Sequence, residues 1–349
     1  MAGTLRIGTH QIGDDTPCYV IAEIGHNHQG RVEKARELFR EAKLAGADAV
    51  KLQKRDNRAL YTQAAYDRPY DNENSFGATY GEHREFLEFG RSEYRDLQGY
   101  ATELGIDFFA TAFDVASADF LQSLDVPAFK IASGDVKSTP LLEHVASFGK
   151  PMIISTGGAL LEDVQRAYDT VMAINPQLGI LQCTAGYPAA FEELGLRVIT
   201  QYRERFAGAV IGFSGHDSGI AMPLAAYVLG ARIVEKHFTL DREMPGPDHR
   251  ASSEPAEFAA LVRGIRAVES ALGDGCKRPA ASEHNTTEVA RKSLVAACDL
   301  PAGTTLTAEM LATLRPGTGL SPALTEQLIG RRLRHAITAH TPLTFQMLA

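Results

Sequence analysis

Lysines, hydroxyl residues and histidines recur in this sequence at the ends of short apolar runs. In chain order these polar residues are Glu23, Lys51 with Gln53, Thr111, Lys130 with Ser133, Ser155 with Thr156, Thr184, Ser214 with His216, and Lys236 with His237. Point charges combined with neutral hydroxyl donors suit a phosphate group. The residues of that kind are Lys51, Lys130, Ser133, Ser155 and Ser214. Taken singly, each is as easily a solvated or backbone-capping residue, but so many in equivalent positions favour one shared site.

Two histidines, His216 and His237, end the last two of these runs and are candidate ligands for a divalent metal ion. Two imidazoles that leave positions open for water and substrate are typical of a catalytic metal site, not of a closed structural one. Asp217 and Asp248 are nearby carboxylates that can add hydrogen bonds around such a site. Glu23 is a candidate acid–base or hydroxyl-orienting group, with an ion pair to a neighbouring lysine as the alternative.

The elements that must bring these residues together are eight apolar runs separated by amphipathic stretches. The predicted strands are Tyr19–Ile24, Ala49–Gln53, Asp107–Ala112, Ala128–Ser133, Met152–Thr156, Gly179–Thr184, Val210–Ser214 and Arg232–His237. They are apolar nearly throughout, as in parallel strands buried on both faces. Helical spacing follows them, for example over Val32–Ala45, Leu161–Ile174 and Ala256–Leu272. Eight strands, each followed by a helix, predict an α/β fold of the (β/α)₈ TIM-barrel type, whose chemistry lies at the C-terminal strand ends.

An open, doubly wound sheet is the alternative fold, but it needs a glycine-rich phosphate loop after its first strand. The residues there, Ile24-Gly-His-Asn-His-Gln-Gly, are not GxGxxG.

A long polar and aromatic segment from Asn57 to Phe89 separates the second predicted strand from its helix, and we expect it to be functional. Residues 1–275 are predicted to form the barrel, and residues 276–289 are predicted to be a linker. Residues 290–349 are predicted as a small appended module with short strands at Ser293–Ala297 and Leu333–Ile337.

Composition narrows the class of protein. The net charge of −8 over 349 residues disfavours a nucleic-acid partner, which basic patches would hold. Cys18, Cys183, Cys276 and Cys298 are far apart and are expected to be reduced thiols. No apolar run approaches the roughly 20 residues needed to cross a bilayer, and the first residues do not resemble a signal peptide. The prediction is a cytoplasmic protein without membrane attachment.

Seven stretches, in order, resemble the sialic acid synthase family. They are Ile21-Ala-Glu-Ile-Gly-His-Asn-His-Gln-Gly, Phe129-Lys-Ile-Ala-Ser-Gly-Asp, Ile154-Ser-Thr-Gly-Gly, Gln182-Cys-Thr-Ala-Gly-Tyr-Pro, Gly212-Phe-Ser-Gly-His-Asp, Val234-Glu-Lys-His-Phe-Thr-Leu-Asp and Gly246-Pro-Asp-His-Arg-Ala-Ser. The end of the chain is similar to that family's antifreeze-like (SAF) domain through Arg291-Lys-Ser-Leu-Val-Ala and Arg315-Pro-Gly-Thr-Gly. The resemblance covers almost the whole chain.

The resemblance implies a role for each candidate residue. The residues implied to hold phosphoenolpyruvate are Lys51, Lys130, Ser133, Ser155 and Ser214. His216 and His237 are implied to bind Mn²⁺, with Mg²⁺ or Co²⁺ as alternatives, and with Glu23 they form the implied catalytic set. The residues implied to line the sugar site are Glu23, Gln53, Tyr187 and Asp248. Arg315 is implied to reach from the small domain into the barrel of a partner subunit, in a domain-swapped homodimer.

The implied reaction condenses phosphoenolpyruvate with N-acetylmannosamine or a related 2-acetamido sugar and releases phosphate. The product is a nine-carbon 2-keto-3-deoxy acid such as N-acetylneuraminate. Ala185 and Gly186 stand where many family members carry a polar residue, which leaves the exact sugar open. We expect an unphosphorylated sugar. Arg68, His83 and Arg84 keep the 6-phosphate open as an alternative, and legionaminic or pseudaminic acid precursors are a further one.

Two alternative functions are a Schiff-base aldolase and a non-catalytic carbohydrate-binding protein. A Schiff-base aldolase would use Lys130 as its nucleophile and would form an adduct that borohydride traps. A non-catalytic carbohydrate-binding protein would bind sugar through its small domain and would have no use for lysines and histidines at the strand ends. Sugar-dependent release of phosphate from phosphoenolpyruvate discriminates against both.

Overall fold

The computed structural model of the protein describes residues 3–349. They divide into two compact units, the first ending at Gly273 and the second running from Asp274 to Ala349. No helix among the described residues is both long and apolar enough to span a membrane.

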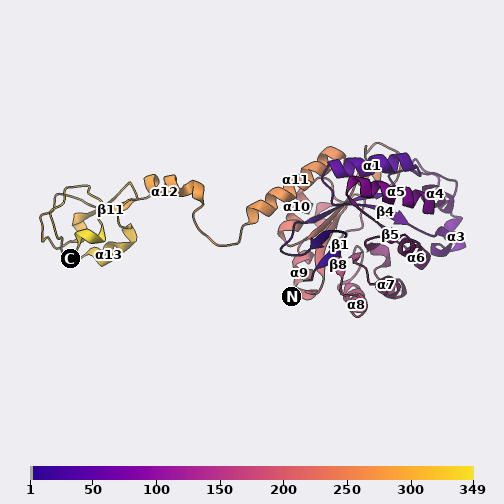
Figure 1. The fold of residues 1–349 in the computed structure, drawn as a ribbon, viewed down its shortest axis with the longest axis horizontal. Coiled ribbons are helices and arrows are strands. Elements are labelled where there is room, and N and C mark those ends of the chain that lie inside the picture. The colour runs from indigo at the N-terminus through magenta and orange to yellow at the C-terminus, as the bar shows by residue number, and fades with distance from the viewer. Residues whose placement is uncertain (1–2) are drawn as a thin grey trace. The chain divides into compact units, whose positions relative to one another are not determined.

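The first unit is a closed barrel of eight parallel strands surrounded by helices (Figure 1). The strands are β3 (Tyr19–Gly25), β4 (Ala49–Lys54), β5 (Asp107–Ala112), β6 (Phe129–Ile131), β7 (Met152–Ser155), β8 (Leu178–Cys183), β9 (Val210–Gly215) and β10 (Ile233–His237). They pair in chain order, and β10 closes the barrel by pairing with both β9 and β3. The predicted TIM barrel is confirmed. The predicted strand Ala128–Ser133 is too long, because Ser133 begins a 3₁₀ turn, η1 (Ser133–Asp135).

Every barrel strand is followed by a helix on the outside. These helices are α1 (Val32–Leu44), α5 (Arg91–Leu104), α6 (Val115–Ser123), α7 (Thr139–Ala146), α8 (Leu161–Met172), α9 (Val198–Arg205), α10 (Ala221–Val228) and α11 (Pro255–Leu272). Local signals fix their ends: Asp114 accepts hydrogen bonds at the start of α6, and Gly105 ends α5 in the left-handed region. Short 3₁₀ turns, η2 (Phe191–Glu193) and η3 (His249–Ala251), lie in the loops after β8 and β10.

The segment between β4 and α5 is not an open loop. It contains α2 (Asn57–Leu60), α3 (Gln63–Tyr66) and α4 (Tyr80–Leu87). A capping box holds the start of α4, where the Thr79 hydroxyl accepts from the backbone of Glu82 and the Glu82 carboxylate accepts from the backbone of Thr79. This segment is therefore ordered enough to present side chains in fixed positions.

A short antiparallel hairpin, β1 (Leu5–Ile7) and β2 (His10–Ile12), lies at the N-terminal ends of the barrel strands. Leu5 and Ile7 are buried, and His10 bonds the Asp107 carboxylate at the start of β5 at 2.9 Å. The sequence does not predict this hairpin, because strands of three residues are too short to show periodicity. It covers the end of the barrel opposite the candidate site.

The second unit has its own small apolar core around Leu294, Leu306 and Leu343. Its elements are η4 (Ala281–Glu283), α12 (His284–Ala290), β11 (Ser293–Ala296), η5 (Ala308–Met310), β12 (Leu311–Leu314), η6 (Pro322–Leu324), α13 (Thr325–Leu328) and η7 (Phe345–Met347). The predicted strand Leu333–Ile337 is wrong: its ends make only isolated bridges, and the partner of β11 is β12. The segment predicted as a linker carries η4 and most of α12.

Candidate active site

A cavity of about 310 Å³ opens at the C-terminal ends of the barrel strands. The predicted site residues that line it are Glu23, Lys51, Gln53, Lys130, Ser133, Ser155, Tyr187, Ser214, His216, His237 and Asp248. They come together because parallel strands of a closed barrel all end at one face. The remaining predicted residue, Arg315, is exposed in the second unit, directly after β12.

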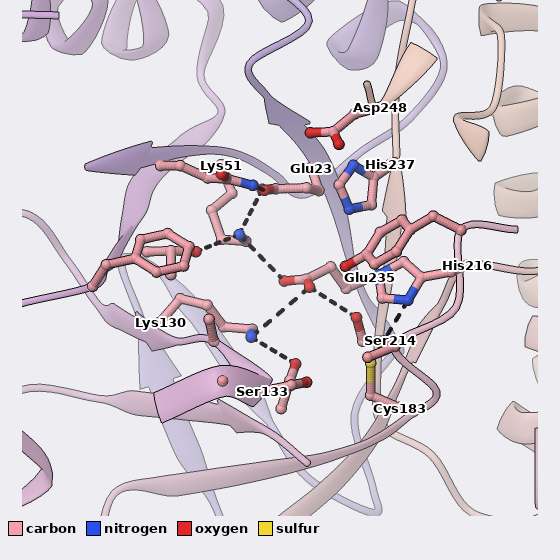
Figure 2. A pocket seen from close by; sticks show the side chains of 18 of the residues that line it. Glu23, Lys51, Lys130, Ser133, Cys183, Ser214, His216, Glu235, His237 and Asp248 are labelled. Carbon is pink, nitrogen blue, oxygen red and sulfur yellow. Dashed lines mark hydrogen bonds and ion pairs between the residues drawn. The ribbon is translucent and has the colours of Figure 1, made fainter. Parts of the chain in front are cut away.

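Two lysines and two glutamates form a buried cluster in this cavity, here called the lysine cluster: Glu23, Lys51, Lys130 and Glu235 (Figure 2). The Lys51 ammonium lies 2.5 Å from a Glu23 oxygen and 3.8 Å from Glu235, and it donates to Thr111. The Lys130 ammonium lies 3.9 Å from the other Glu235 oxygen. The expected alternative for Glu23, an ion pair with a neighbouring lysine, is thus present in the structure.

Opposite charges are equal in number in the lysine cluster, which makes its burial tolerable. Burial alone would raise the pKa of Glu235, but Lys130 and Lys51 outweigh it and lower that pKa to about 2. Burial lowers the pKa of Lys130, and Glu235 opposes the change. Lys130 also donates to the Ser155 hydroxyl at 2.6 Å and to the Ile131 carbonyl at 2.9 Å. These contacts favour its ammonium form.

His216 and His237 end neighbouring strands, with ring centroids 5.3 Å apart. The Nδ1 atom of His216 donates to the Thr184 carbonyl at 2.7 Å, which leaves Nε2 free to bind a ligand. The Nδ1 atom of His237 is buried without a hydrogen-bond partner. Burial, and then the neighbouring His237, lower the pKa of His216 to about 4, so its ring is neutral.

This pair of imidazoles fits a divalent metal ion. Neutral nitrogen donors are suitable ligands, and the carbonyl bond to His216 is the usual support for a metal-binding ring. Among residues 3–349, no group of three His, Cys, Asp or Glu side chains is arranged to hold a metal ion. The site therefore fits an ion that completes its shell with water or substrate oxygens.

Gln53 and Asp248 lie beside Glu23 on the same side of the cavity. The Gln53 amide donates to Glu23 at 2.7 Å. Gly25 allows this approach: its φ is 54°, and a Cβ there would come within 3.1 Å of Asp248 and 3.2 Å of Gln53. The Tyr187 ring lies against His216, with ring centroids 4.1 Å apart and the ring planes tilted by 34°. This side of the cavity offers hydroxyl, amide and carboxylate groups suited to a polyol.

Glu235 is a site residue that the sequence analysis missed. Successive residues of a strand point to opposite sides, so Glu235 shares a side with His237, and Lys236 faces away. The structure shows this: Lys236 donates to the Asp217 carbonyl, its ammonium lies 3.5 Å from the Asp217 carboxylate, and neither residue lines the cavity. The alternation in Val234-Glu-Lys-His could have identified Glu235.

Two arginines of the long segment also line the cavity, Arg55 directly after β4 and Arg84 on α4. Arg84 is one of the three sequence candidates for contact with a distal phosphate. Of the other two, Arg68 is exposed and His83 is fully buried, and neither lines the cavity. His26, which lies outside the predicted metal site, sits between the two arginines at 3.1 Å from each. Arg55, His26 and Arg84 are here called the arginine cluster.

Comparisons with known proteins place this geometry in context. The NeuB family model matches residues 38–277, and an SAF domain model matches residues 291–349. The N-acetylneuraminate-9-phosphate synthase of Mus musculus is 45% identical over 300 residues, 86% of this chain and 84% of that protein. The N,N'-diacetyllegionaminic acid synthase of Legionella pneumophila is 38% identical over 340 residues, 96% of this chain and 95% of that protein.

Solved structures agree with the sequence relatives. The crystal structure of N-acetylneuraminic acid (sialic acid) synthetase from Leptospira borgpetersenii, in complex with citrate, is 32% identical with a TM-score of 0.72. The match covers 82% of this chain and 96% of that one. The names of these three similar proteins describe synthases or a synthetase.

Proposed function

The chain belongs to the NeuB family and is an enzyme of the synthase type, and from this premise we propose that it joins phosphoenolpyruvate to a 2-acetamido sugar such as N-acetylmannosamine. The product is a nine-carbon 2-keto-3-deoxy acid such as N-acetylneuraminate, and phosphate is released. One observation carries the proposal: two lysines, three serines and two imidazoles line a single cavity at the C-terminal ends of the barrel strands.

Phosphoenolpyruvate is assigned to the lysine side of the cavity. Lys51 and Lys130 supply fixed positive charge, and the serine hydroxyls of Ser133, Ser155 and Ser214 supply neutral donors. Because the glutamates hold both ammonium groups in place before substrate arrives, little reorganisation is needed on binding.

His216 and His237 are assigned to a divalent metal ion, with Mn²⁺ proposed first and Mg²⁺ or Co²⁺ as alternatives. When bound, the ion supplies Lewis-acid polarisation of the sugar's aldehyde oxygen. Tyr187, whose ring lies 4.1 Å from that of His216, borders this imidazole pair.

The proposed reaction balances as follows. The C2–C3 π electrons of phosphoenolpyruvate form a bond from C3 to the aldehyde carbon, whose oxygen takes a proton and becomes a hydroxyl. A water oxygen adds to C2 and loses its protons, and the C2–O bond to phosphate breaks to leave a ketone and free phosphate. Glu23, bonded to Lys51 and Gln53, is placed to hold a sugar hydroxyl and to exchange a proton with it.

The contacts of Lys130 argue against a Schiff-base mechanism. An amine nucleophile must lose its proton and one of its partners, whereas Lys130 has a serine, a carbonyl and a carboxylate around it. Borohydride reduction in the presence of both substrates should therefore leave the protein mass unchanged.

We include a domain-swapped homodimer in the proposal. Arg315 is an exposed side chain on a turn that is braced within its own unit, since the Gly317 amide donates to the Glu288 carbonyl at 2.7 Å. A guanidinium so placed suits a hydroxyl-rich ligand in the barrel of a second copy.

The test is phosphate release from phosphoenolpyruvate, measured with Mn²⁺ and a panel of sugars. The panel contains N-acetylmannosamine, its 6-phosphate, mannose and diacetamido sugars. The diacetamido sugars represent a second candidate class, because relatives include legionaminic and pseudaminic acid synthases. Release that depends on an amino sugar supports the proposal, and no release with any of them contradicts it.

A further inference from the structure

The arginine cluster differs from an ordinary structural ion pair, because two guanidinium groups meet at one imidazole. The Nη1 atom of Arg55 lies 3.1 Å from His26 Nε2, and the Nη1 atom of Arg84 lies 3.1 Å from His26 Nδ1. His26 is 3% exposed. Burial, and then Arg55 and Arg84, hold the pKa of His26 well below its usual value, so the ring is neutral.

A neutral imidazole accepts a hydrogen bond at only one of its two nitrogens. Guanidinium groups donate and never accept. One of the two arginines must therefore point an N–H group at another N–H group of His26. In addition, Arg55 Nε is buried without a partner. The cluster has more donors than its own acceptors can satisfy, and buried polar groups without partners are costly.

The cluster also carries more positive charge than its surroundings neutralise. Arg84 donates to the Tyr80 hydroxyl at 2.8 and 3.1 Å, not to a carboxylate. Glu88 offsets only part of this charge: its Oε1 atom, which makes no hydrogen bond, lies 3.9 Å from Arg55 Nη1, while its Oε2 atom pairs with Lys54 at 3.0 Å. One carboxylate thus serves both Lys54 and Arg55, and it makes no ion pair with Arg84.

Contacts with aromatic rings explain how the two guanidinium groups are oriented, but they do not neutralise the positive charge. Arg55 lies over the Phe113 ring at 3.7 Å, and Arg84 lies over Tyr80 at 5.0 Å. Such contacts orient a guanidinium and leave it fully charged. Asp248 attracts Arg84 at longer range and makes no ion pair with it. A ligand with negative charge would supply both the missing acceptors and the missing charge.

We propose that Arg55 and Arg84 form a second anion subsite in the cavity, which binds a phosphate carried by the amino sugar at the end remote from its aldehyde. The proposal rests on the function proposed above and names its substrate class as a phosphorylated 2-acetamido sugar, in place of the unphosphorylated sugar expected from sequence.

The hydrogen-bond chain supports this placement. Gln53 donates to Glu23 and accepts from Arg55, both at 2.7 Å. Arg55 is therefore the direct neighbour of a residue that is proposed to contact the sugar. Two guanidinium forks match the several oxygens of a phosphate better than the single charge of a carboxylate. The other anion of the reaction, phosphoenolpyruvate, has its own cations in the lysine cluster.

The first experiment compares two sugars on the full-length protein with Mn²⁺ and phosphoenolpyruvate. We expect kcat/KM for N-acetylmannosamine 6-phosphate to exceed that for N-acetylmannosamine by about 1000-fold, since each of two charge-assisted contacts is worth about thirtyfold. Equal values for the two sugars would overturn the subsite and leave the proposed function standing. No phosphate release with any amino sugar would instead overturn the proposed function.

The second experiment uses variants. Arg84→Gln should lower kcat/KM for the phosphorylated sugar about thirtyfold and change the value for the unphosphorylated sugar less than about threefold. Arg68→Gln removes an exposed arginine of the same segment and should change neither value. Tyr80→Phe removes the bracing hydroxyl but keeps the charge, so it should retain most of the preference. An equal loss on both sugars, or a loss confined to the KM for phosphoenolpyruvate, would overturn the assignment of Arg84.

Discussion

The lysine cluster and the two arginines of the arginine cluster line one cavity, but the buried charges of the two clusters are balanced to different degrees. In the first, Lys51 and Lys130 face Glu23 and Glu235, so the charges balance before any ligand arrives. In the second, Arg55 and Arg84 share one neutral imidazole, and the single carboxylate of Glu88 is divided between Lys54 and Arg55.

This difference in charge balance indicates that the two clusters have different functions. A balanced set keeps its geometry whether or not substrate is bound, which suits the reacting end of a site, where position matters most. An unbalanced set gains its missing partner only from a ligand, which suits recognition of one substrate over another. Changes on the lysine and histidine side should therefore affect every sugar, and changes in the arginine cluster should affect selectivity.

The largest effect is expected from the two histidines. His216→Ala and His237→Ala should each lower turnover at least about 1000-fold with both the phosphorylated and the unphosphorylated sugar, since Lewis-acid polarisation is worth several kcal/mol. Chelation of the wild-type protein should do the same, and added Mn²⁺ should restore it. His144→Ala, at a surface histidine on α7, is the control. Full turnover in chelator or in either variant would contradict the metal assignment.

The next largest effect is expected from Arg315 in the second unit, which is proposed to complete the cavity in the barrel of another copy. Arg315→Ala and Glu23→Ala should each lose at least about a hundredfold in turnover. Co-refolding them in equal amounts should recover about a quarter of wild-type activity, because half the dimers are mixed and each mixed dimer has one intact site. Arg334→Ala, also exposed in that unit, should stay active alone. Mixed dimers that are seen by mass but remain inactive would contradict sharing between copies.

A smaller effect separates the two anion sites. Lys130→Ala should raise the KM for phosphoenolpyruvate about thirtyfold, corresponding to about 2 kcal/mol for one charge-assisted contact, and leave the KM for the sugar nearly unchanged. Lys137→Ala, at a largely exposed lysine after η1, should change neither. If both KM values rise together for Lys130→Ala, the lysine is shared or structural and the division of the cavity into two anion sites is wrong.

The lysine and histidine side was predictable from sequence for a simple physical reason. Parallel strands end at one face, so residues as distant as Lys51 and His237 converge once the strands are recognised. The same rule, applied with strand alternation, would have identified Glu235.

Arg84 is a sequence candidate for a distal phosphate, but its grouping with Arg55 and His26 is not predictable, and neither is the hairpin. Arg84 meets His26 across 58 positions of sequence through three short helices, and no period or spacing predicts that contact. The β1–β2 strands are too short to carry a pattern, and the predicted strand Leu333–Ile337 makes only isolated bridges. The features that the sequence does not predict are those formed by irregular segments and by very short strands.

The smallest effect compares the response to acid of two glutamates, Glu235 in the lysine cluster and Glu88 beside the arginine cluster. The pKa of Glu235 is about 2 in the fold, below its ordinary value, so its contribution to stability is present above about pH 4.5 and is lost as pH falls toward 2. The pKa of Glu88 is raised by burial, against the pull of Lys54 and Arg55, so its protonation on acidification favours the fold. Urea unfolding at pH 6 and pH 3 should show that Glu235→Gln loses less stability than wild type, by on the order of 2 kcal/mol. Glu88→Gln should lose more than wild type. If the two variants respond to acid in the same direction, the balanced and unbalanced surroundings inferred for the two clusters are wrong.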